Sequence, residues 1–376
     1  MKRANAMQTC DVLIVGGGPA GSSCAWQLRR HGADVIVLDK ALFPRDKVCA
    51  GWITPAVEQA LELDISDYSE QCVLQPITAF HTGLIGGETV ETRYPATVSY
   101  GIRRCELDNY LLRRTGAQLQ LGQPLLSMTR AGKNWIVNGT ISTPLVIGAG
   151  GHFCPVARFM GAKIGADEPA IVAKEIEFKM SPAQHAICQV QGDAPELYFC
   201  ADLQGYGWCF RKGNYLNIGL GREDNHQLTE RLHEFCNFLK MRGRIPADIP
   251  AKFHGHAYLL HGHNVRQQVA DGMLLIGDAA GLAYPQSGEG IRPAVESGLL
   301  AASTIRRAQG DYGAQQLQPY ADSLLARFGT KPAAAAGPAF LRNYLAEKLL
   351  GNRWFTRHVV LNRWFLHSGQ PAMQAS

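Results

Sequence analysis

The stretch Asp11-Val-Leu-Ile-Val15 followed by Gly16-Gly-Gly18-Pro-Ala-Gly21 decides the fold of this chain. An apolar run leads into a glycine turn, and residues 22–31 then read as a helix. In a nucleotide-binding unit the first glycine makes the tight turn, the second lets the backbone approach a pyrophosphate, and the third lets the helix pack on the strand. The spacing therefore predicts a dinucleotide whose phosphates lie at the helix N-terminus.

A second apolar run, residues 34–38, ends at Asp39, about 20 residues beyond the glycine turn. A carboxylate at that distance accepts the hydroxyl groups of a ribose. A glycine-rich turn in an ordinary parallel sheet would explain the turn, but it would not explain the acid. The order of strand, turn, helix, strand and acid favours the dinucleotide site.

Another glycine-containing segment lies far along the chain. Residues 271–281 read as a turn, a buried strand and a helix start that carries Asp278, and residues 284–302 read as a glycine loop entering an alanine-rich helix. This arrangement would place Asp278 near the ribityl chain of a flavin. It would also direct the backbone N–H groups of the loop at the electron-rich edge of the flavin ring.

In these motifs the chain resembles the geranylgeranyl reductase family of FAD-dependent oxidoreductases. That family lies within a larger flavoprotein group that includes aromatic hydroxylases and flavin-dependent halogenases. The resemblance rests on GGGPAG at 16–21, PRDKVCAG at 44–51, GYGWCFRKG at 205–213, GDAAG with PxxGEG at 277–290, and a weaker RxxFDxxL-like match at 104–111. It implies that the following residues bind FAD: Gly16, Gly18, Pro19, Ala20, Gly21, Asp39, Lys40, Arg45, Cys49, Ala50, Gly51, Arg104, Gly277, Asp278, Gly288, Gly290 and Ile291.

The resemblance also implies an α/β fold. A Rossmann-like FAD-binding domain would be assembled from residues 1–75, 100–165 and 265–330. An antiparallel-sheet substrate domain would be inserted as residues 76–99 and 166–264, and residues 331–376 would form a C-terminal helical segment. Alternation of apolar residues predicts strands in the inserted part at 171–178, 196–202, 207–211 and 216–221.

Tyr206, Trp208 and Phe210 are two residues apart, so on a strand they share one face. Such an aromatic wall suits a prenyl chain or a planar ring, although an ordinary aromatic core face is an equal alternative. The family motif resembles YxWxFP, and Arg211 stands where the proline is expected. We expect Arg211 to bind a phosphate or carboxylate of the substrate.

Cys49 is the candidate catalytic residue, in a loop that borders the flavin ring in similar reductases. Flanking Arg45 and Lys47 would favour its thiolate. The family pattern resembles KxCGG, and Ala50 replaces one glycine. A buried, unreactive cysteine is the structural alternative.

The activity implied by the resemblance is reduction of carbon–carbon double bonds in an isoprenoid or other lipid-like substrate. Reduced flavin would deliver a hydride from N5 to one alkene carbon, and Cys49 would protonate the other. The electron donor stays open between NAD(P)H, a reductase partner and a ferredoxin, because the sequence has no second GxGxxG unit.

Two other functions compete with this interpretation. One is a flavin-dependent monooxygenase or halogenase. Gly150-Gly151, where related hydroxylases carry Asp-Gly, weakens the hydroxylase alternative, and the 206–211 segment does not fit the WxWxIP pattern of halogenases. The other is a flavin-bound redox sensor or a membrane-associated binding protein, which would be favoured by a flavin that no physiological donor reduces.

Composition agrees with a globular enzyme of about two domains. The chain has 376 residues, 46% of them hydrophobic, and no uninterrupted apolar run of the roughly 18 residues that a membrane span needs. The start of the sequence is too short and polar for a signal peptide, which predicts a cytoplasmic protein. Ten scattered cysteines without a CxxC pair suggest neither disulfides nor zinc. His254, His256, His261 and His263 form two HxH pairs, which we interpret as solvent-facing or substrate-lining rather than as a metal site.

Basic charge gathers near the end of the sequence. From residue 337 onward the sequence has five Lys or Arg residues and one acidic residue, and aromatic residues alternate with the basic ones at roughly helical spacing. A basic aromatic helix could lie on the inner face of a membrane, peripherally, or it could pack on the protein with its arginines outward. Nucleic-acid binding is not expected, since no basic stripe or known module occurs elsewhere. The tail residues behind this prediction are Phe340, Arg342, Tyr344, Glu347, Lys348, Arg353, Trp354, Phe355, Arg357, Arg363, Trp364 and Phe365.

Overall fold

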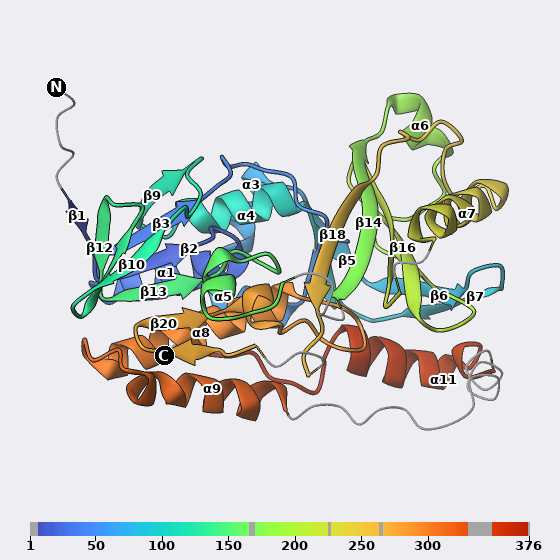
Figure 1. The fold of residues 1–376 in the computed structure, drawn as a ribbon. Coiled ribbons are helices and arrows are strands. Elements are labelled where there is room, and N and C mark those ends of the chain that lie inside the picture. The colour runs from blue at the N-terminus through green and yellow to red at the C-terminus, as the bar shows by residue number, and fades with distance from the viewer. Residues whose placement is uncertain (1–6, 165–169, 225–226, 263–265, 330–347, 375–376) are drawn as a thin grey trace.

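Two large sheets occupy opposite halves of the molecule (Figure 1). The computed structural model describes residues 7–164, 170–224, 227–262, 266–329 and 348–374.

The first sheet has six strands in the order β19-β20-β13-β2-β3-β9. Strand β2 (Val12–Val15) is central and pairs in parallel with β3 (Val35–Asp39) on one side and β13 (Leu145–Gly148) on the other. Its side chains are all buried, as expected of a parallel strand covered on both faces. The remaining strands of this sheet are β9 (Gln118–Leu121), β19 (Val269–Ala270) and β20 (Met273–Leu275).

Helix α1 (Pro19–Arg30) leaves the glycine turn and packs on α8 (Ile291–Ala308). The predicted strand, turn and helix are confirmed, but α1 starts three residues earlier than expected because Pro19 fits the first helical position. The other elements around this sheet are α2 (Pro55–Leu61), α3 (Ile65–Gln71), α4 (Arg104–Arg113), α5 (Pro155–Phe159), η1 (Gly277–Ala280) and α9 (Ala314–Phe328).

Two small sheets flank the first. One has the order β1-β12-β11-β10 and the other β4-β8-β5. Their bounds are β1 (Gln8–Thr9), β10 (Met128–Ala131), β11 (Asn134–Val137), β12 (Ile141–Thr143), β4 (Trp52–Ile53), β5 (Leu74–Ile77) and β8 (Ser99–Ile102).

The second large sheet has seven strands in the order β18-β14-β17-β16-β15-β6-β7. The four predicted strands are present, and all neighbours are antiparallel except β15 and β6, which are parallel. Two helices, α6 (Pro182–Ile187) and α7 (Leu228–Met241), belong to this half. The strands are β6 (Ala79–Leu84), β7 (Thr89–Arg93), β14 (Ala170–Lys179), β15 (Glu196–Phe199), β16 (Gly205–Lys212), β17 (Tyr215–Arg222) and β18 (His254–Leu259).

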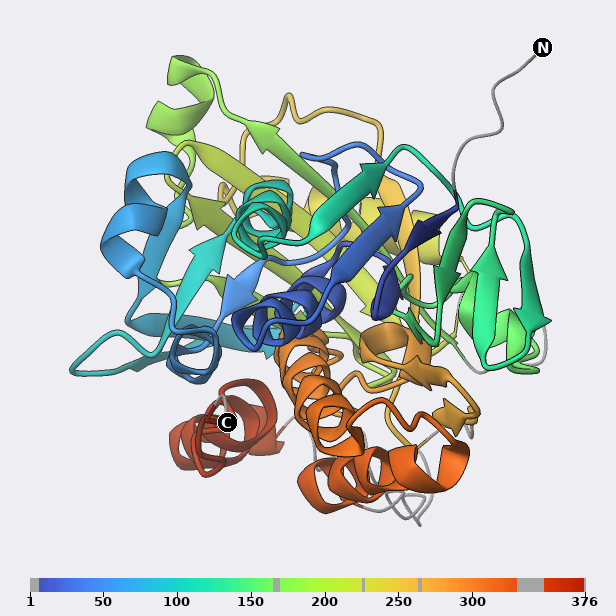
Figure 2. The same cartoon turned by 90° about the vertical axis from the view of Figure 1, so that its left-hand side faces the viewer.

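The C-terminal segment packs against this second sheet. It contains α11 (Arg353–Phe355) and η2 (Thr356–Phe365), a π-helix, which are the red helix of the turned view (Figure 2). Leu361 and Phe365 are buried against the aromatic face of the sheet, so the predicted packing is confirmed for the described part of the tail. The first part of the predicted tail, including Phe340, Arg342, Tyr344 and Glu347, lies outside the described residues. Among the described residues, no helix is long and apolar enough to cross a membrane.

Candidate functional site

A cavity of about 860 Å³ lies where the two large sheets meet. Ligand pockets commonly span about 300–1,000 Å³. Its lining draws on both halves of the molecule and on residues more than 250 positions apart in the sequence. The predicted site residues that line it are Gly16, Gly18, Pro19, Ala20, Asp39, Lys40, Arg45, Cys49, Ala50, Gly51, Arg104, Tyr206, Trp208, Phe210, Asp278, Gly288, Gly290 and Ile291.

One end of the cavity is the glycine turn before α1. Gly16 has φ +120°, a conformation that side-chain-bearing residues rarely adopt. Gly21 does not line the cavity. It packs against the turn so closely that a Cβ there would overlap the carbonyl oxygen of Gly16. The turn thus leaves the N-terminus of α1 open to the cavity, where unpaired N–H groups and the helix dipole favour an anion.

Asp39 lines the cavity and also holds the turn in place. Its carboxylate accepts hydrogen bonds from the backbone N–H groups of Gly17 at 2.7 Å and Ala41 at 2.8 Å. This bracing role was not anticipated from the sequence. It leaves the remaining lone pairs of the carboxylate available to ribose hydroxyls.

The loop before α8 forms the opposite wall. Gly290 is the N-cap of α8, and Gly288 has φ +66° with the hydroxyl of Tyr258 where its Cβ would be. Gly277 does not line the cavity. It has φ +59°, and a Cβ there would lie 2.9 Å from that of Ala20, so Gly277 allows η1 to approach α1 closely.

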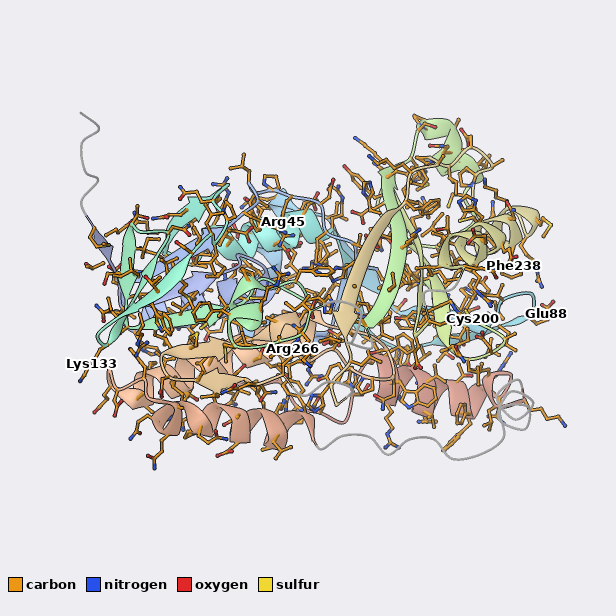
Figure 3. All side chains as sticks on the ribbon, in the orientation of Figure 1. Arg45, Glu88, Lys133, Cys200, Phe238 and Arg266 are labelled. Atoms are coloured by element: carbon orange, nitrogen blue, oxygen red, sulfur yellow. The ribbon has the colours of Figure 1, made fainter. Side chains whose placement is uncertain are left out.

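Two guanidinium groups share one buried carboxylate at the cavity wall. Arg104 binds Asp108 through two hydrogen bonds of 3.0 and 3.1 Å, and Arg45 lies 3.2 Å from the same carboxylate. Arg45 is seen beside α4 in Figure 3. Because two cations face one anion, this wall carries net positive charge, which suits a pyrophosphate.

Lys47 and His256 form a second polar cluster with Asp278. The Lys47 ammonium lies 2.7 Å from Nε2 of His256, and that nitrogen lies 3.7 Å from the Asp278 carboxylate. Burial lowers the pKa of Lys47 to about 8 and also lowers the pKa of His256. Burial opposes ionisation of Asp278, but His256 and Lys47 hold its pKa below the usual value.

Neither Lys47 nor His256 was singled out as a site residue. Lys47 stands inside the quoted PRDKVCAG motif, and His256 belongs to an HxH pair, so both carried a local signal. Within the described ranges no group of three or more potential metal ligands occurs, and His261 is hydrogen-bonded to the Gly329 carbonyl. His263 lies outside the described residues.

Cys49 is half-buried at the centre of the cavity wall. Its sulfur accepts a hydrogen bond from the N–H of Gly51 at 3.3 Å, and the guanidinium of Arg104 lies close enough to interact with it electrostatically. All ten cysteines of the chain are free thiols. Cys49 therefore combines access to the cavity with a cationic neighbour, as a proton donor at this place requires.

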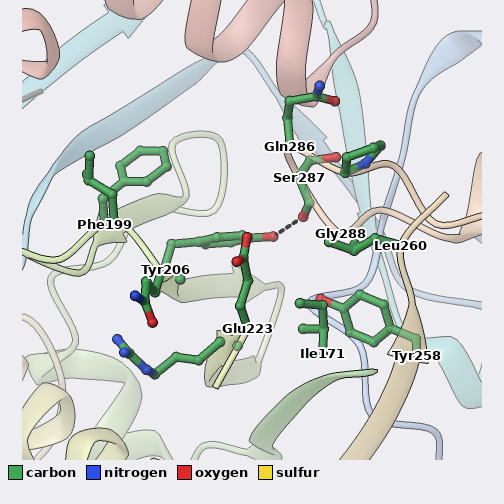
Figure 4. A pocket seen from close by; sticks show the side chains of 15 residues that line it. Ile171, Phe199, Tyr206, Glu223, Tyr258, Leu260, Gln286, Ser287 and Gly288 are labelled. Carbon is green, nitrogen blue, oxygen red and sulfur yellow. Dashed lines mark hydrogen bonds between the residues drawn. The ribbon is translucent and has the colours of Figure 1, made fainter. Parts of the chain in front are cut away.

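Tyr206, Trp208 and Phe210 form the aromatic wall, all on one face of β16. The hydroxyl of Tyr206 donates to the carbonyl of Ser287, which ties the wall to the loop before α8 (Figure 4). The Tyr206 ring also lines a smaller pocket beyond the main cavity. On the same face of the sheet, Phe365 of the tail meets Tyr206 edge-on with ring centroids 5.3 Å apart.

The structure does not bring Arg211 to the cavity. Because side chains alternate along a strand, Arg211 points to the face opposite Trp208 and Phe210. There its guanidinium is hydrogen-bonded to His185 and, at 3.4 Å, to the Val190 carbonyl. The expectation that Arg211 contacts an anionic substrate in this cavity is therefore corrected.

The chain is similar to several known proteins. The family model "FAD dependent oxidoreductase" matches residues 11–84. The menaquinone reductase of Mycobacterium tuberculosis is 30% identical over 79% of this chain and 76% of that protein. The digeranylgeranylglycerophospholipid reductase of Methanocaldococcus jannaschii is 26% identical over 82% of this chain and 81% of that protein.

Two solved structures share the fold. A geranylgeranyl bacteriochlorophyll reductase-like protein from Thermoplasma acidophilum has a TM-score of 0.74 at 23% identity, covering 92% of this chain and 88% of that one. A flavin-dependent brominase has a TM-score of 0.70 at 15% identity, covering 96% of this chain and 93% of that one. The shared fold extends over nearly the whole chain in both cases.

Proposed function

This chain belongs to the geranylgeranyl reductase family of FAD-dependent oxidoreductases, and from that premise we propose that it binds FAD and reduces carbon–carbon double bonds of a prenylated lipid. The observation that carries the proposal is that one cavity is lined by the glycine turn, by the thiol of Cys49 and by the aromatic wall. Nucleotide, proton donor and apolar surface thus meet in a single space.

Several features support FAD as the nucleotide. The N-terminus of α1 and the wall formed by Arg45 and Arg104 suit the pyrophosphate, and Asp39 suits the ribose hydroxyls. The N-terminus of α8 at Gly290 directs N–H groups into the same cavity, where they suit the electron-rich edge of a flavin ring. We assign the discontinuous segments 1–75, 100–165 and 265–330 to this cofactor, residues 76–99 and 166–264 to the substrate, and residues 331–376 to the tail.

When bound, reduced FAD supplies the hydride for the alkene. The protein contributes the proton: Cys49 donates its thiol proton to the second alkene carbon, and the Arg104 guanidinium stabilises the thiolate that remains. Tyr206, Trp208 and Phe210 exclude water and pack along the prenyl chain.

Prenyl chains are the feature that the named activities of the two relatives share, one acting on menaquinone and the other on a digeranylgeranyl phospholipid. We propose an apolar, prenylated small molecule as substrate, and NAD(P)H, a reductase or a ferredoxin as electron donor. The tail presents Leu349 and Trp354 to solvent beside Arg353. We therefore propose a cytoplasmic enzyme that contacts the inner face of the membrane peripherally through this tail.

The decisive experiment uses FAD-loaded protein reduced anaerobically with dithionite. Menaquinone, digeranylgeranylglycerophospholipid and geranylgeranyl diphosphate are added in separate reactions, and flavin reoxidation is followed by absorbance and product saturation by mass spectrometry. Reoxidation with a product two mass units heavier per reduced bond supports the proposal, provided that for menaquinone the added mass remains after the quinol ring has been reoxidised in air. Reoxidation only on admission of oxygen, with a hydroxylated or halogenated product, would identify the monooxygenase alternative. A flavin that no donor reduces would identify a binding protein or sensor.

A further inference from the structure

A buried polar cluster lies in the seven-stranded sheet directly beneath the loop that carries Cys49. Its members are Glu175 and Glu177 on β14, Lys212 on β16 and Asn217 on β17. Glu175, Lys212 and Asn217 are each at most 5% exposed. Buried polar groups are costly unless their hydrogen bonds are satisfied, so the partners of this cluster are informative.

Asn217 joins the aromatic wall to the Cys49 backbone. The indole N–H of Trp208 donates to Oδ1 of Asn217 at 2.7 Å, and Nδ2 of Asn217 donates to the carbonyl of Cys49 at 3.1 Å. An indole nitrogen can only donate and a carbonyl can only accept, so these two partners fix the orientation of the amide without ambiguity. Trp208 therefore fixes the oxygen end of the Asn217 amide, and the Cys49 carbonyl takes its nitrogen end.

Glu175 lies beside the same amide. Its carboxyl accepts a hydrogen bond from Nδ2 of Asn217 at 3.3 Å, and the nearby backbone of Cys49 partly offsets the rise in its pKa. Asn217 thus holds the Cys49 carbonyl, and Glu175 in turn holds Asn217. Residues 49 and 217 are 168 positions apart, so nothing local to the loop produces this contact.

The two glutamates of the cluster have different charges. Burial opposes ionisation of Glu177, but Lys212 at 2.8 Å and Arg103 at 3.2 Å hold its pKa below the usual value. Glu175 has no such pair of cations, and burial raises its pKa to about 8. Glu175 is therefore a neutral acid at pH 7, and the clamp holds Cys49 without placing a second buried anion beside it.

We propose that Trp208, Asn217 and Glu175 form a clamp that positions Cys49 in the cavity. They are positioning residues, since they act through the Cys49 backbone. Trp208 then has two roles: its ring faces the substrate, and its N–H holds the Asn217 amide in place. The inference rests on the proposed function in assigning proton donation to Cys49, but the clamp itself is defined by contacts within the chain.

The test measures the alkylation rate of Cys49 by iodoacetamide at pH 8 in FAD-loaded protein, by peptide mass spectrometry and without substrate. The variants are Trp208→Phe, which keeps an aromatic ring and removes the donor, and Asn217→Leu. Thr82→Val is the matched control, because Thr82 is buried in the same sheet and donates only to the Val90 carbonyl. The alkylation rates of half-buried Cys72 and Cys105, measured in the same digest, show whether a substitution has loosened the whole fold.

We expect Cys49 to be alkylated at least about fivefold faster in Trp208→Phe and in Asn217→Leu, with the rates of Cys72 and Cys105 unchanged. The double variant should add little to either single change, because both break one chain of contacts. An unchanged Cys49 rate in Trp208→Phe would overturn the clamp, even if Asn217→Leu does not fold. Equal acceleration at all three cysteines would also overturn it. Since no alkene is present, failure of the proposed reduction would leave this readout unaffected.

Discussion

Cys49 meets the cavity through its sulfur, while its backbone is held from below by the sheet. If its thiol donates the proton, Cys49→Ser should lower kcat for alkene reduction at least about 100-fold, because a hydroxyl is a far weaker acid and general acid catalysis commonly contributes about 10²–10⁴-fold. The measurement is steady-state turnover alongside FAD content from absorbance. Full turnover in a variant with intact FAD would remove the catalytic role.

Glu175 gives a prediction about pH at the same scale. Its pKa is about 8 in the folded chain, against roughly 4.3 for an unperturbed glutamate. Between these two values the folded state holds a proton that the unfolded state has released, so the free energy of unfolding falls as pH rises from about 5 to 8.

Glu175→Gln keeps a neutral side chain of nearly the same shape and removes this titration. We expect the variant to gain stability relative to the natural chain between pH 5 and pH 9, by roughly 4 kcal/mol, since the window from about pH 5 to pH 8 spans about three units and one unit corresponds to about 1.4 kcal/mol. Urea denaturation at pH 5, 7 and 9 measures the difference. If the free energy of unfolding depends on pH in the same way in the natural chain and in Glu175→Gln, the pKa of Glu175 is not raised in the folded state.

At the scale of elements, the contact between the glycine turn and α1 allows no added atom. Gly21→Ala places a Cβ against the carbonyl oxygen of Gly16, so the helix must move away from the turn that faces the phosphates. We expect FAD affinity to fall at least tenfold and the thermal midpoint to drop by several degrees. Gly87→Ala is the control, because its Cβ meets only ordinary contacts, the nearest at 3.5 Å.

FAD content after dialysis and a thermal melt separate the two effects in Gly21→Ala. Unchanged FAD retention, with or without a lower melting temperature, would mean that the turn tolerates a shifted helix. In that case the cofactor would depend on other contacts of the cavity.

The same scale shows why some of the site was predictable from sequence. The glycine turn, Asp39 and the loop before α8 are encoded locally, because each requires a special backbone conformation or a fixed spacing. Period-two alternation placed Tyr206, Trp208 and Phe210 together, and the same rule applied to Arg211 would have placed it on the other face.

Long-range contacts could not be found in this way. Lys47 meets His256 across 209 positions, and Asn217 meets Cys49 across 168. Neither pair leaves a periodic or compositional trace in a single sequence. The parallel pairing of β15 with β6 escaped prediction for the same reason, since strand order depends on how distant segments pack.

For the whole molecule, the tail links the two halves. Phe365 packs against the aromatic wall, and farther along Arg292 of α8 donates to the carbonyls of Gln370 and Pro371. The C-terminal segment therefore contacts both the substrate wall and the helix whose N-terminus borders the cofactor cavity. A buried residue and an exposed residue of this tail should behave in opposite ways.

Phe365 is fully buried and Trp354 is 66% exposed, so one substitution should affect stability and the other membrane contact. Phe365→Ala should lower the free energy of unfolding by about 3–5 kcal/mol, as large-to-small core changes do. Trp354→Ala should leave it within about 0.5 kcal/mol. Trp354→Ala should instead reduce cosedimentation with vesicles containing anionic lipid, because interfacial binding depends on the exposed aromatic ring and basic charge.

The salt dependence of vesicle binding separates the contribution of the basic residues from that of the exposed aromatic ring. Raising ionic strength should weaken vesicle binding of the natural chain by screening Arg353 and Arg363, which are exposed in the same segment as Trp354. If the natural chain and Trp354→Ala bind vesicles equally at low and high salt, the tail packs on the protein and does not contact the membrane. Access to a lipid-borne substrate would then have to involve another surface of the molecule.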